Sequence, residues 1–548
     1  MANYGGFQSV KLTKPRRSDF DMNHRRRMTT KIGRLTPCFI TECVPSDTWS
    51  GSSEVLLRLA PLLAPIFDGL RLFVHFFFVP NRLLWEQWEE FITGGRLGVG
   101  VDPIEAPVPP CVKISAFNGN PSYLAEGSLA DNLGVPDLTQ LEGSLSDYGN
   151  ATLDLMPFAA YQQIYFDYYR DRNFVPDTDM DLPLQSGEIN FATAQKYFEH
   201  RQRNFLHDYF TSALPFTQRG EEVLMPMAGT GSVSYLDVSR VLESDGTPAI
   251  WNSTDPLDVM TSSPGDLRVP TIGTTVAGRI ENIDEIDFDG STVSINDFRS
   301  AYALQVWLER NAIGGSRYVE STQAHFGIKP QDQRLQRAEY LGGGRIDVRI
   351  TEVVATAFSD SDGNTVPQGN MAGHGVTYGN TNRFKYFCVE HGFIVGILSI
   401  MPEPSYHQGL PRMFRRRSFL DYPWPTFAKL GEQEVAKAEL YASAANLEED
   451  ENGALPLFGY QSRYADWKYI ANTSHGAFHS SMLFWTLTRD FASSPVLGKA
   501  FNEVPTTLAD RIFAVQDSGY DNFWMYISNN CKAVRPLPYF GTPNTLGF

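Results

Sequence analysis

The sequence predicts a mainly β protein, a β-sandwich or barrel whose long loops contain helices. Widely spaced strand-like segments run along the 548 residues, and 45 glycines and 34 prolines suit the turns and long connections between them. Hydrophobic residues make up 42% of the chain and aromatic residues 13%, which is enough to fill a large core and excludes a disordered protein. No repeat of about 20 to 50 residues is present, so we expect neither a solenoid nor a propeller.

The first 37 residues are expected to form an extended basic arm, because they show neither a helical nor an alternating apolar pattern. Residues 11–34 contain nine Lys and Arg against two Asp, a net charge of +7, which leaves −24 for the rest of a chain whose net charge is −17. This asymmetry indicates a polyanion at one surface, and we favour nucleic acid. The residues expected to contact it are Arg16, Arg17, Arg25, Arg26, Arg27, Lys31 and Arg34.

Residues 38–219 are expected to form the first part of the β body. From Leu70 to Val79 the chain is apolar at nearly every position, with many aromatic residues, which predicts a strand buried on both faces. Pro80 ends this strand, and Asn81 is predicted to be the N-cap of a short helix. The helix sets two tryptophans on one surface, where they either cap the body or anchor a neighbouring subunit. These are Trp85 and Trp88.

Two further stretches complete this part of the chain. Residues 99–155 are rich in Gly, Pro, Asn and Ser and are interpreted as an elaborated loop. Residues 155–174 then show a helical period with an aromatic stripe, which indicates core packing or, as the alternative, a platform on which bases stack. The stripe consists of Phe158, Tyr161, Ile164, Tyr165 and Tyr168.

A change of texture marks residues 220–295, which are small, polar and acidic. About 75 residues is far beyond a normal connection, so we expect an inserted, exposed segment. Residues 296–548 are expected to complete the body. They open with a helix over 296–311 and continue with strand-like segments, which lie at 345–358, 384–408 and 476–491.

Sequence motifs of catalysis are missing. The chain contains no HExxH, no GxSxG and no paired CxxC, so we predict no catalytic residue and no cofactor. Residues 285–296 resemble a calcium loop but lack its closing bidentate carboxylate, and His475 and His479 lack an evident third ligand, so no metal site is predicted. The five cysteines are expected to be free thiols, and no apolar run is long enough to cross a membrane.

Arginine clusters outside the arm are the remaining signal. Arg415, Arg416 and Arg417 suit either phosphate binding or pairing with acidic residues across a subunit contact, and both alternatives stay open. Similar clusters follow the aromatic helix and consist of Arg170, Arg172, Arg201 and Arg203.

Several long, aromatic-rich blocks resemble those of a known family, and they occur in that family's order. They read HFFFVPNRLLWEQWEEFITGG, LMPFAAYQQIYFDYYRDRNF, DYFTSALPFTQRG, RSAYALQVWLERNAIGGSRYVESTQAHFGI, QRLQRAEYLGGG and FGYQSRYADWKYIANTSHG. The chain is similar, over about residues 10–548, to the major capsid proteins of the Microviridae, and most of all to the gokushovirus type, the equivalent of the F protein of φX-like phages.

This resemblance implies an eight-stranded antiparallel jelly roll with long insertions. It also implies self-assembly, through pentamers, into a T=1 icosahedral shell around circular single-stranded DNA. The virion would be assembled in the host cytoplasm and would include a small basic DNA-packaging protein and a minor pilot protein. Residues 220–295 would form the protrusion at the threefold axes that meets a host receptor. The competing hypothesis is an acidic β-sandwich that binds or hydrolyses carbohydrate.

Overall fold

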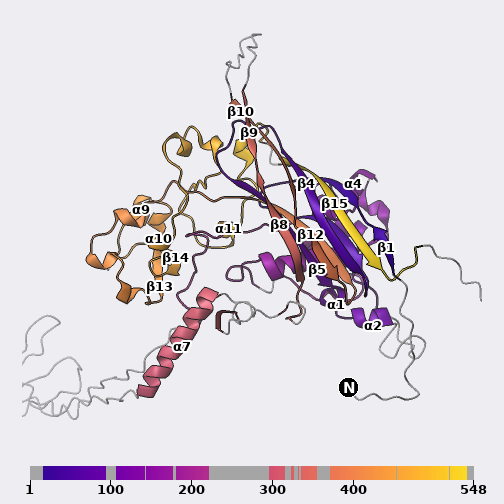
Figure 1. Ribbon diagram of the computed structural model, residues 1–548, viewed down its shortest axis with the longest axis horizontal. Helices are drawn as coiled ribbons and strands as arrows, with labels where there is room; N and C mark the ends of the chain where they lie inside the picture. Colours follow the sequence, from indigo (N-terminus) through magenta and orange to yellow (C-terminus); the bar gives the residue numbers. More distant parts are fainter. Residues whose placement is uncertain are drawn as a thin grey trace, which may run out of the picture. The chain divides into compact units, whose positions relative to one another are not determined.

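Two antiparallel sheets dominate the computed structural model (Figure 1). The structure describes residues 17–93, 107–141, 144–176, 180–220, 295–314, 323–325, 331, 335–354, 371–451, 453–516 and 519–539. These residues confirm the mainly β fold that the sequence predicts.

The larger sheet has seven strands, in the order β1-β15-β4-β10-β9, with β2 paired to β15 and β11 paired to β4. Every pairing in it is antiparallel. The strands are β1 (Ser18–Asp21), β2 (His24–Thr30), β4 (Thr48–Leu59), β9 (Ile350–Val354), β10 (Met371–Asn380), β11 (Phe384–Phe387) and β15 (Phe523–Arg535).

The smaller sheet has four strands in the order β3-β12-β5-β8, again antiparallel throughout. They are β3 (Thr36–Cys43), β5 (Leu70–Pro80), β8 (Glu339–Val348) and β12 (Gly392–Pro402). Two hairpin-sized sheets lie in the connections, β6 (Cys111–Lys113) with β7 (Thr152–Asp154) and β13 (Glu432–Ala436) with β14 (Leu457–Ser462).

Most of the α-helices are single turns within the connections. They are α1 (Asn81–Leu84), α2 (Trp88–Thr93), α3 (Leu129–Leu133), α4 (Leu138–Leu141), α5 (Met156–Ile164), α6 (Phe191–Ala194), α7 (Ile295–Gly314), α9 (Ala444–Leu447), α10 (Ala465–Lys468) and α11 (Lys499–Asn502). Among the described helices, none is both long enough and apolar enough to span a bilayer.

The chain divides into two units, one of residues 1–217 and 311–548 and one of residues 218–310. The expected insertion at 220–295 lies almost wholly outside the described residues. The helix predicted at 296–311 is present as α7, which is slightly longer at both ends.

Strand β5 explains why the smaller sheet needs a cover on each face. Its even-numbered side chains from Leu70 to Phe78 join a core with the inward residues of β4 and β15. On the opposite side, Phe77 and Val79 belong to a second core built with the helical connections, whereas Arg71, Phe73 and His75 are half-buried. The prediction that this strand is buried on both faces is therefore confirmed for its second half, from Phe76 onward.

The helical cover of the second core comes from α1, α5 and the π-helical turn Tyr165–Tyr169. Phe158, Tyr161, Ile164 and Tyr165 are all at most 2% exposed, so the aromatic stripe is core packing and cannot stack bases. Trp85 is fully buried in the same core, and its Nε1 donates a hydrogen bond to Ser186 Oγ at 2.8 Å. Trp88 is half-buried against it. Trp85 is thus part of the core of the body, and Trp88 packs against its edge.

Three local predictions were wrong. The N-cap of α1 is Pro80, and Asn81 is the first helical residue, because the chain enters the helix directly from β5. Residues 476–491 hold no strand; Gly476–His479 and Leu483–Trp485 are 3₁₀ turns, since this apolar stretch finds no strand partner. The interpretation of residues 1–37 as an arm fails from residue 18 onward.

In that segment β1 and β2 both pair with β15, which lies some 500 residues later in the sequence. Exposed and half-buried side chains do alternate along β2, but its three arginines conceal this pattern in the sequence. Arg25 and Arg27 face solvent, whereas Arg26 and Met28 are half-buried on the other side of the strand. Residues 1–16 lie outside the described part of the chain.

Trp85 and Trp88 allow a matched test of this packing. Trp85→Ala should move the urea-unfolding midpoint of the unassembled subunit down by the equivalent of about 3–5 kcal/mol, the usual cost of deleting a buried aromatic side chain. Trp88→Ala should cost clearly less, because that ring is half-buried. Equal losses for the two variants would contradict the packing that we describe.

Candidate nucleic-acid interface

The exposed face of the seven-stranded sheet carries the basic residues of β2 next to aromatic residues of β15. Antiparallel register places Arg27 opposite Tyr526, which in turn lies opposite Leu56 of β4 and, across it, Tyr378 of β10. Side chains opposite each other on neighbouring strands have Cβ atoms about 5 Å apart, so these four form one continuous row.

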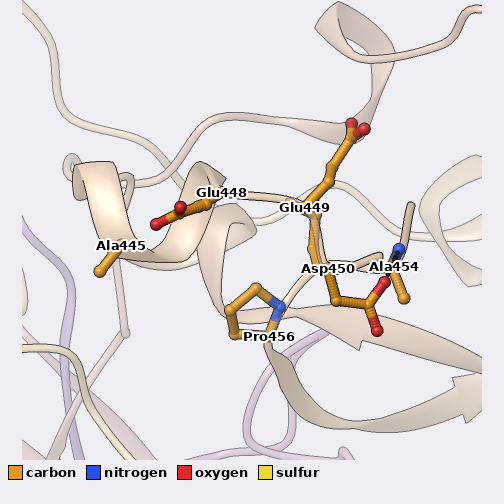
Figure 2. A pocket seen from close by; sticks show the side chains of 7 residues that line it. Ala445, Glu448, Glu449, Asp450, Ala454 and Pro456 are labelled. Carbon is orange, nitrogen blue, oxygen red and sulfur yellow. Dashed lines mark hydrogen bonds between the residues drawn. The ribbon is translucent and has the colours of Figure 1, made fainter. Parts of the chain in front are cut away.

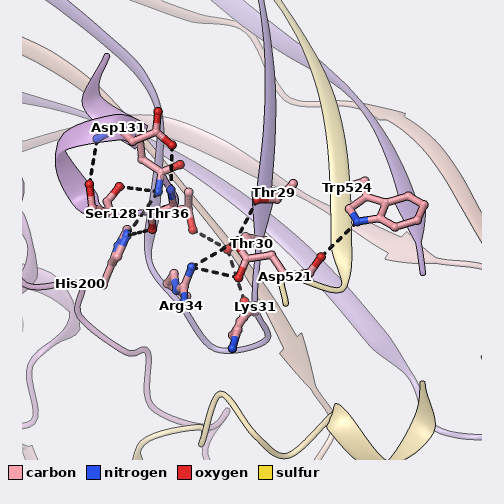
Figure 3. Close-up of polar contacts among 12 residues, drawn as sticks. Thr29, Thr30, Lys31, Arg34, Thr36, Ser128, Asp131, His200, Asp521 and Trp524 are labelled. Atoms are coloured by element: carbon pink, nitrogen blue, oxygen red, sulfur yellow. Dashed lines mark hydrogen bonds and ion pairs between the residues drawn. The ribbon is translucent and has the colours of Figure 1, made fainter. Parts of the chain in front are cut away.

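A second row runs parallel to the first. It passes from Thr29 to Trp524, then to Arg58 and Val376. The Trp524 Nε1 donates a hydrogen bond to the Asp521 carbonyl at 3.1 Å, which fixes the indole at the end of β15 (Figure 3). We call these two rows, together with Arg25, the basic aromatic face.

The cations of this face are available to a ligand. Within the described part of the chain, none of Arg25, Arg27 and Arg58 forms an ion pair, and all three are exposed. The nearby carboxylate is engaged, because Glu54 accepts hydrogen bonds from Tyr378 Oη at 3.1 Å and from Asn530 Nδ2 at 3.0 Å. Unpaired guanidinium groups next to exposed rings suit a polyanion that also offers bases to stack.

Arg26 has a different role, although it stands between Arg25 and Arg27. Its Nη1 donates to the Asn132 carbonyl and its Nη2 to the Leu133 carbonyl, both at 3.1 Å. These are the last carbonyls of α3, whose orphan acceptors are satisfied by this cation. Burial lowers the pKa of Arg26. The side chain therefore joins α3 to β2 and is not free for phosphate.

The other predicted arm residues are also engaged within the chain. Arg34 pairs with Asp521 at 3.4 Å, and Figure 3 shows this pair beside Thr29, which donates to the same carboxylate. Lys31 is half-buried; burial raises the pKa of Asp510, and the charge of Lys31 partly offsets this rise. Arg17 donates to Ser46 and lies over the Phe387 ring, 5.4 Å from its centroid. Arg16 lies outside the described residues.

The Arg415–Arg417 cluster is neutralised by carboxylates of the same chain, an outcome that neither alternative anticipated. Arg415 lies 3.2 Å from Glu439 and Arg416 lies 2.6 Å from Asp466, both in half-buried or buried pairs. Arg417 is more exposed and lies 3.5 Å from Glu449.

Arginines of the other clusters serve the core. Arg203 donates to Ser399 Oγ at 2.8 Å and lies 4.3 Å from the centroid of the Phe73 ring. Arg201 donates to Gln162 at 2.7 Å, and Arg170 lies over Phe166. All three are buried or half-buried, so the hypothesis that they bind nucleic acid was wrong for them.

No cluster of potential metal ligands occurs among the described residues. An acidic pocket of about 370 Å³ contains Glu448, Glu449 and Asp450 (Figure 2). Asp450 Oδ1 already accepts the Ala454 amide at 2.7 Å, and Glu449 pairs with Arg417. The histidines singled out by spacing do not share a strand face, and His479 stacks on His407. All five cysteines are free.

Sequence analysis missed Arg58, Trp524, Tyr526 and Tyr378. The alternation of β15 does place Trp524 and Tyr526 on the side opposite the buried Met525 and Ile527, and this signal is visible in the sequence. Their position next to Arg27, however, depends on a register between the two ends of the chain.

Comparison with known proteins defines the class. The family described as "Capsid protein (F protein)" matches residues 8–545, so the protein is a viral capsid protein. The chain is 34% identical to the capsid protein VP1 of Chlamydia phage 1, over 98% of this chain and 97% of the relative. It is 32% identical to VP1 of Bdellovibrio phage phiMH2K, over 100% and 98%, and 28% identical to VP1 of Spiroplasma virus 4, over 96% and 95%.

The chain therefore belongs to the capsid protein family of the Microviridae, as its aromatic blocks indicated. This is a structural family, so the protein is not an enzyme, and the hydrolase hypothesis is set aside. As a capsid protein it forms the virion.

His200, which lies beside the residues of α3 (Figure 3), should make the fold sensitive to acid. Burial, and secondarily the charge of Arg34, lowers the pKa of His200 to about 4. Its Nε2 lies 3.2 Å from both the Asn132 amide and the Gly127 carbonyl. The unfolded chain binds this proton near pH 6.5 and the folded chain only near pH 4. Stability is therefore present above pH ~6.5 and is lost as the pH falls toward 4, by on the order of 3 kcal/mol.

Replacing His200 with Gln should remove this loss, because an amide can donate to Gly127 and accept from Asn132 without titrating. The measurement is the unfolding midpoint of both proteins between pH 7 and pH 4. Buried carboxyls with a raised pKa, such as Glu439 and Asp167, act in the opposite direction in both proteins, so the difference between the proteins isolates the histidine. Parallel curves would contradict the assignment.

Proposed function

We propose that the two sheets form a jelly roll. The eight long strands follow the chain order β2, β3, β4, β5, β8, β10, β12 and β15. Numbered one to eight in that order, they pair as 1-8-3-6 in the larger sheet and as 2-7-4-5 in the smaller one. This pairing, with the first strand beside the last, is the order of a double Greek key and supports the proposal.

The function that we propose is that of the major capsid protein of a small phage. Identical copies would assemble, through pentamers, into a T=1 icosahedral shell that encloses a circular single-stranded DNA genome. Membership of the capsid family supports self-association. Assembly would take place in the cytoplasm of the bacterial host. A small basic packaging protein and a minor pilot protein are the further virion partners that we propose.

The observation that supports DNA binding most directly is the basic aromatic face. Among the described residues Arg25, Arg27 and Arg58 have no ion-pair partner, and Trp524 offers an exposed ring beside them. Proteins that hold single strands without reading sequence combine such cations with stacking rings. We propose that this face meets the genome, and that Arg26 and Arg34 support it from below.

We propose host attachment for the insertion at residues 220–295. Its length and polar composition support exposure, and the segmentation of the chain at 218–310 supports an element that could change without disturbing the body.

The shell can be tested by electron microscopy of the purified full chain, which should show closed particles of one size. A variant that lacks residues 225–290 should form particles of the same inner diameter but should fail to adsorb to host cells. Subunits that stay monomeric under all assembly conditions would contradict the shell. If particles of this variant still adsorb to host cells, the insertion has no role in attachment.

Single-stranded DNA binding should depend on β2 in a position-specific way. Arg25→Ala with Arg27→Ala should weaken binding of unassembled subunits to oligodeoxythymidine and should reduce the slope of log K against log salt by about 1.4, at ~0.7 per lost phosphate contact. Arg26→Ala should instead lower the unfolding midpoint, because the carbonyls of α3 lose a charged donor.

Arg417→Ala is the matched control, since that exposed arginine already has Glu449 as a partner and should leave the slope unchanged. The measurement is fluorescence anisotropy from low to moderate salt. An unaltered slope in the Arg25 and Arg27 variant would remove the basic aromatic face from the DNA surface.

A further inference from the structure

A second exposed surface, distinct in chemistry from the first, lies on the connection that carries α10, β13 and β14 (Figure 1). Its large apolar side chains project from residues 413–430 and 467–470. The most exposed of them are Phe414 (68%), Phe419 (71%) and Ile470 (97%). Tyr422, Trp424 and Trp467 are about half exposed. We call these six residues the apolar surface.

Contacts join four of these side chains in two pairs, and Phe414 and Ile470 lie on the same two segments, two residues before Arg416 and three residues after Trp467. The Arg416 guanidinium lies 4.2 Å from the centroid of the Trp467 ring and 5.7 Å from that of Tyr422, so it joins the two rings. Trp424 Nε1 donates to the Phe419 carbonyl at 2.9 Å, which joins a second pair.

The backbone beneath is fixed by polar contacts. Asp421 accepts the amides of Arg417 and Ser418 at 2.8 and 2.7 Å and closes a capping box. Arg416 is held by Asp466 at 2.6 Å, and Gln433 donates to the same carboxylate at 3.1 Å. A loop ordered from below in this way holds its rings exposed without using them for its own folding. Such rigid anchors lose little entropy on binding.

The six side chains of the apolar surface together expose an area that is comparable with one side of a protein interface. At 150–250 Å² for a full aromatic side chain, the six exposed fractions amount to on the order of 700 Å². The largest apolar patch on a monomer is about 300–600 Å², and one side of a stable protein interface contributes about 800 Å².

The chemistry of the apolar surface favours protein over nucleic acid. Its arginines pair with carboxylates of the same chain, Arg415 with Glu439, Arg416 with Asp466 and the more exposed Arg417 with Glu449, so among the described residues these three guanidinium groups are already engaged. Exposed rings supported by arginine are also the typical anchors of protein interfaces.

We infer that the apolar surface is a contact between copies of this chain, and that it holds neighbouring subunits together. This inference rests on the proposed shell and names one surface that closes it. In a closed ring the contact is heterologous, so the apolar surface of one copy lies on a different surface of the next.

Substituting exposed residues tests the inference with little risk to folding. Phe419→Glu combined with Ile470→Glu should leave the circular dichroism and the unfolding midpoint of the subunit unchanged but should raise the concentration needed for assembly at least about a hundredfold, as expected when two anchors are lost. Val496→Glu, at a 69% exposed apolar residue elsewhere in the body, is the matched control and should assemble as the parent does.

If the parent chain assembles and the double variant assembles equally well, the inference is overturned, whereas the proposed shell still stands. Loss of assembly in the control as well would overturn it too, because the effect would not be specific to this surface. A parent chain that never assembles would instead contradict the proposed function.

Hydrogen exchange of the unmodified protein gives an independent measurement that needs no variant. Peptides covering residues 412–430 and 463–470 should exchange at least tenfold more slowly in particles than in free subunits. Equal exchange in the two states would overturn the inference, even if the substituted protein were to misfold.

Discussion

The four-stranded sheet must be covered on both faces, and the remainder of the body follows from this constraint. β12 is buried at every one of its positions, and β5 is fully buried along its second half. Each buried Phe, Leu or Ile contributes about 1.5–3 kcal/mol only when water is excluded from it. One face is therefore covered by the seven-stranded sheet, and the other requires the helical connections that contain α1 and α5. The long excursions of this chain are the second cover of its central sheet.

The constraint was visible in the sequence wherever one segment carried the whole signal. The strand at 70–79, the aromatic helix and the helix that became α7 were predicted because their periods are strong and local. The strands β1 and β2 were missed because polar and charged residues occupy both of their sides, including Arg26 beside Met28 on the inward side of β2, which gives little apolar contrast. They form strands because they pair with β15, which lies at the far end of the chain. The error at 476–491 has the same origin, since an apolar stretch becomes a strand only when a neighbour supplies hydrogen bonds.

The roles of individual arginines were beyond the sequence for a related reason. Arg25, Arg26 and Arg27 are adjacent and chemically identical. Yet Arg26 donates hydrogen bonds to the last carbonyls of α3, while Arg25 and Arg27 face solvent. The alternation of a strand places Arg26 on the opposite side from Arg25 and Arg27, and the position of α3 determines which groups Arg26 contacts. In the same way Arg203 lies over Phe73, and Arg416 lies between Trp467 and Asp466. A count of basic residues therefore overstates the charge that is open to a ligand. The carboxylate partners have to be known first.

The separation of the two exposed surfaces gives a physical account of how an acidic chain can enclose a polyanion. The chain carries a net charge of −17, which repels phosphate. DNA is therefore attracted only where unpaired cations cluster, as they do around Arg25, Arg27 and Arg58. The apolar surface has the opposite character, because its arginines are neutralised internally and its rings are exposed. A surface of that kind attracts protein without competing for DNA. On the proposed arrangement, a subunit is oriented by charge toward the genome and is joined to its neighbours by apolar contact, so that neither interaction has to be given up for the other.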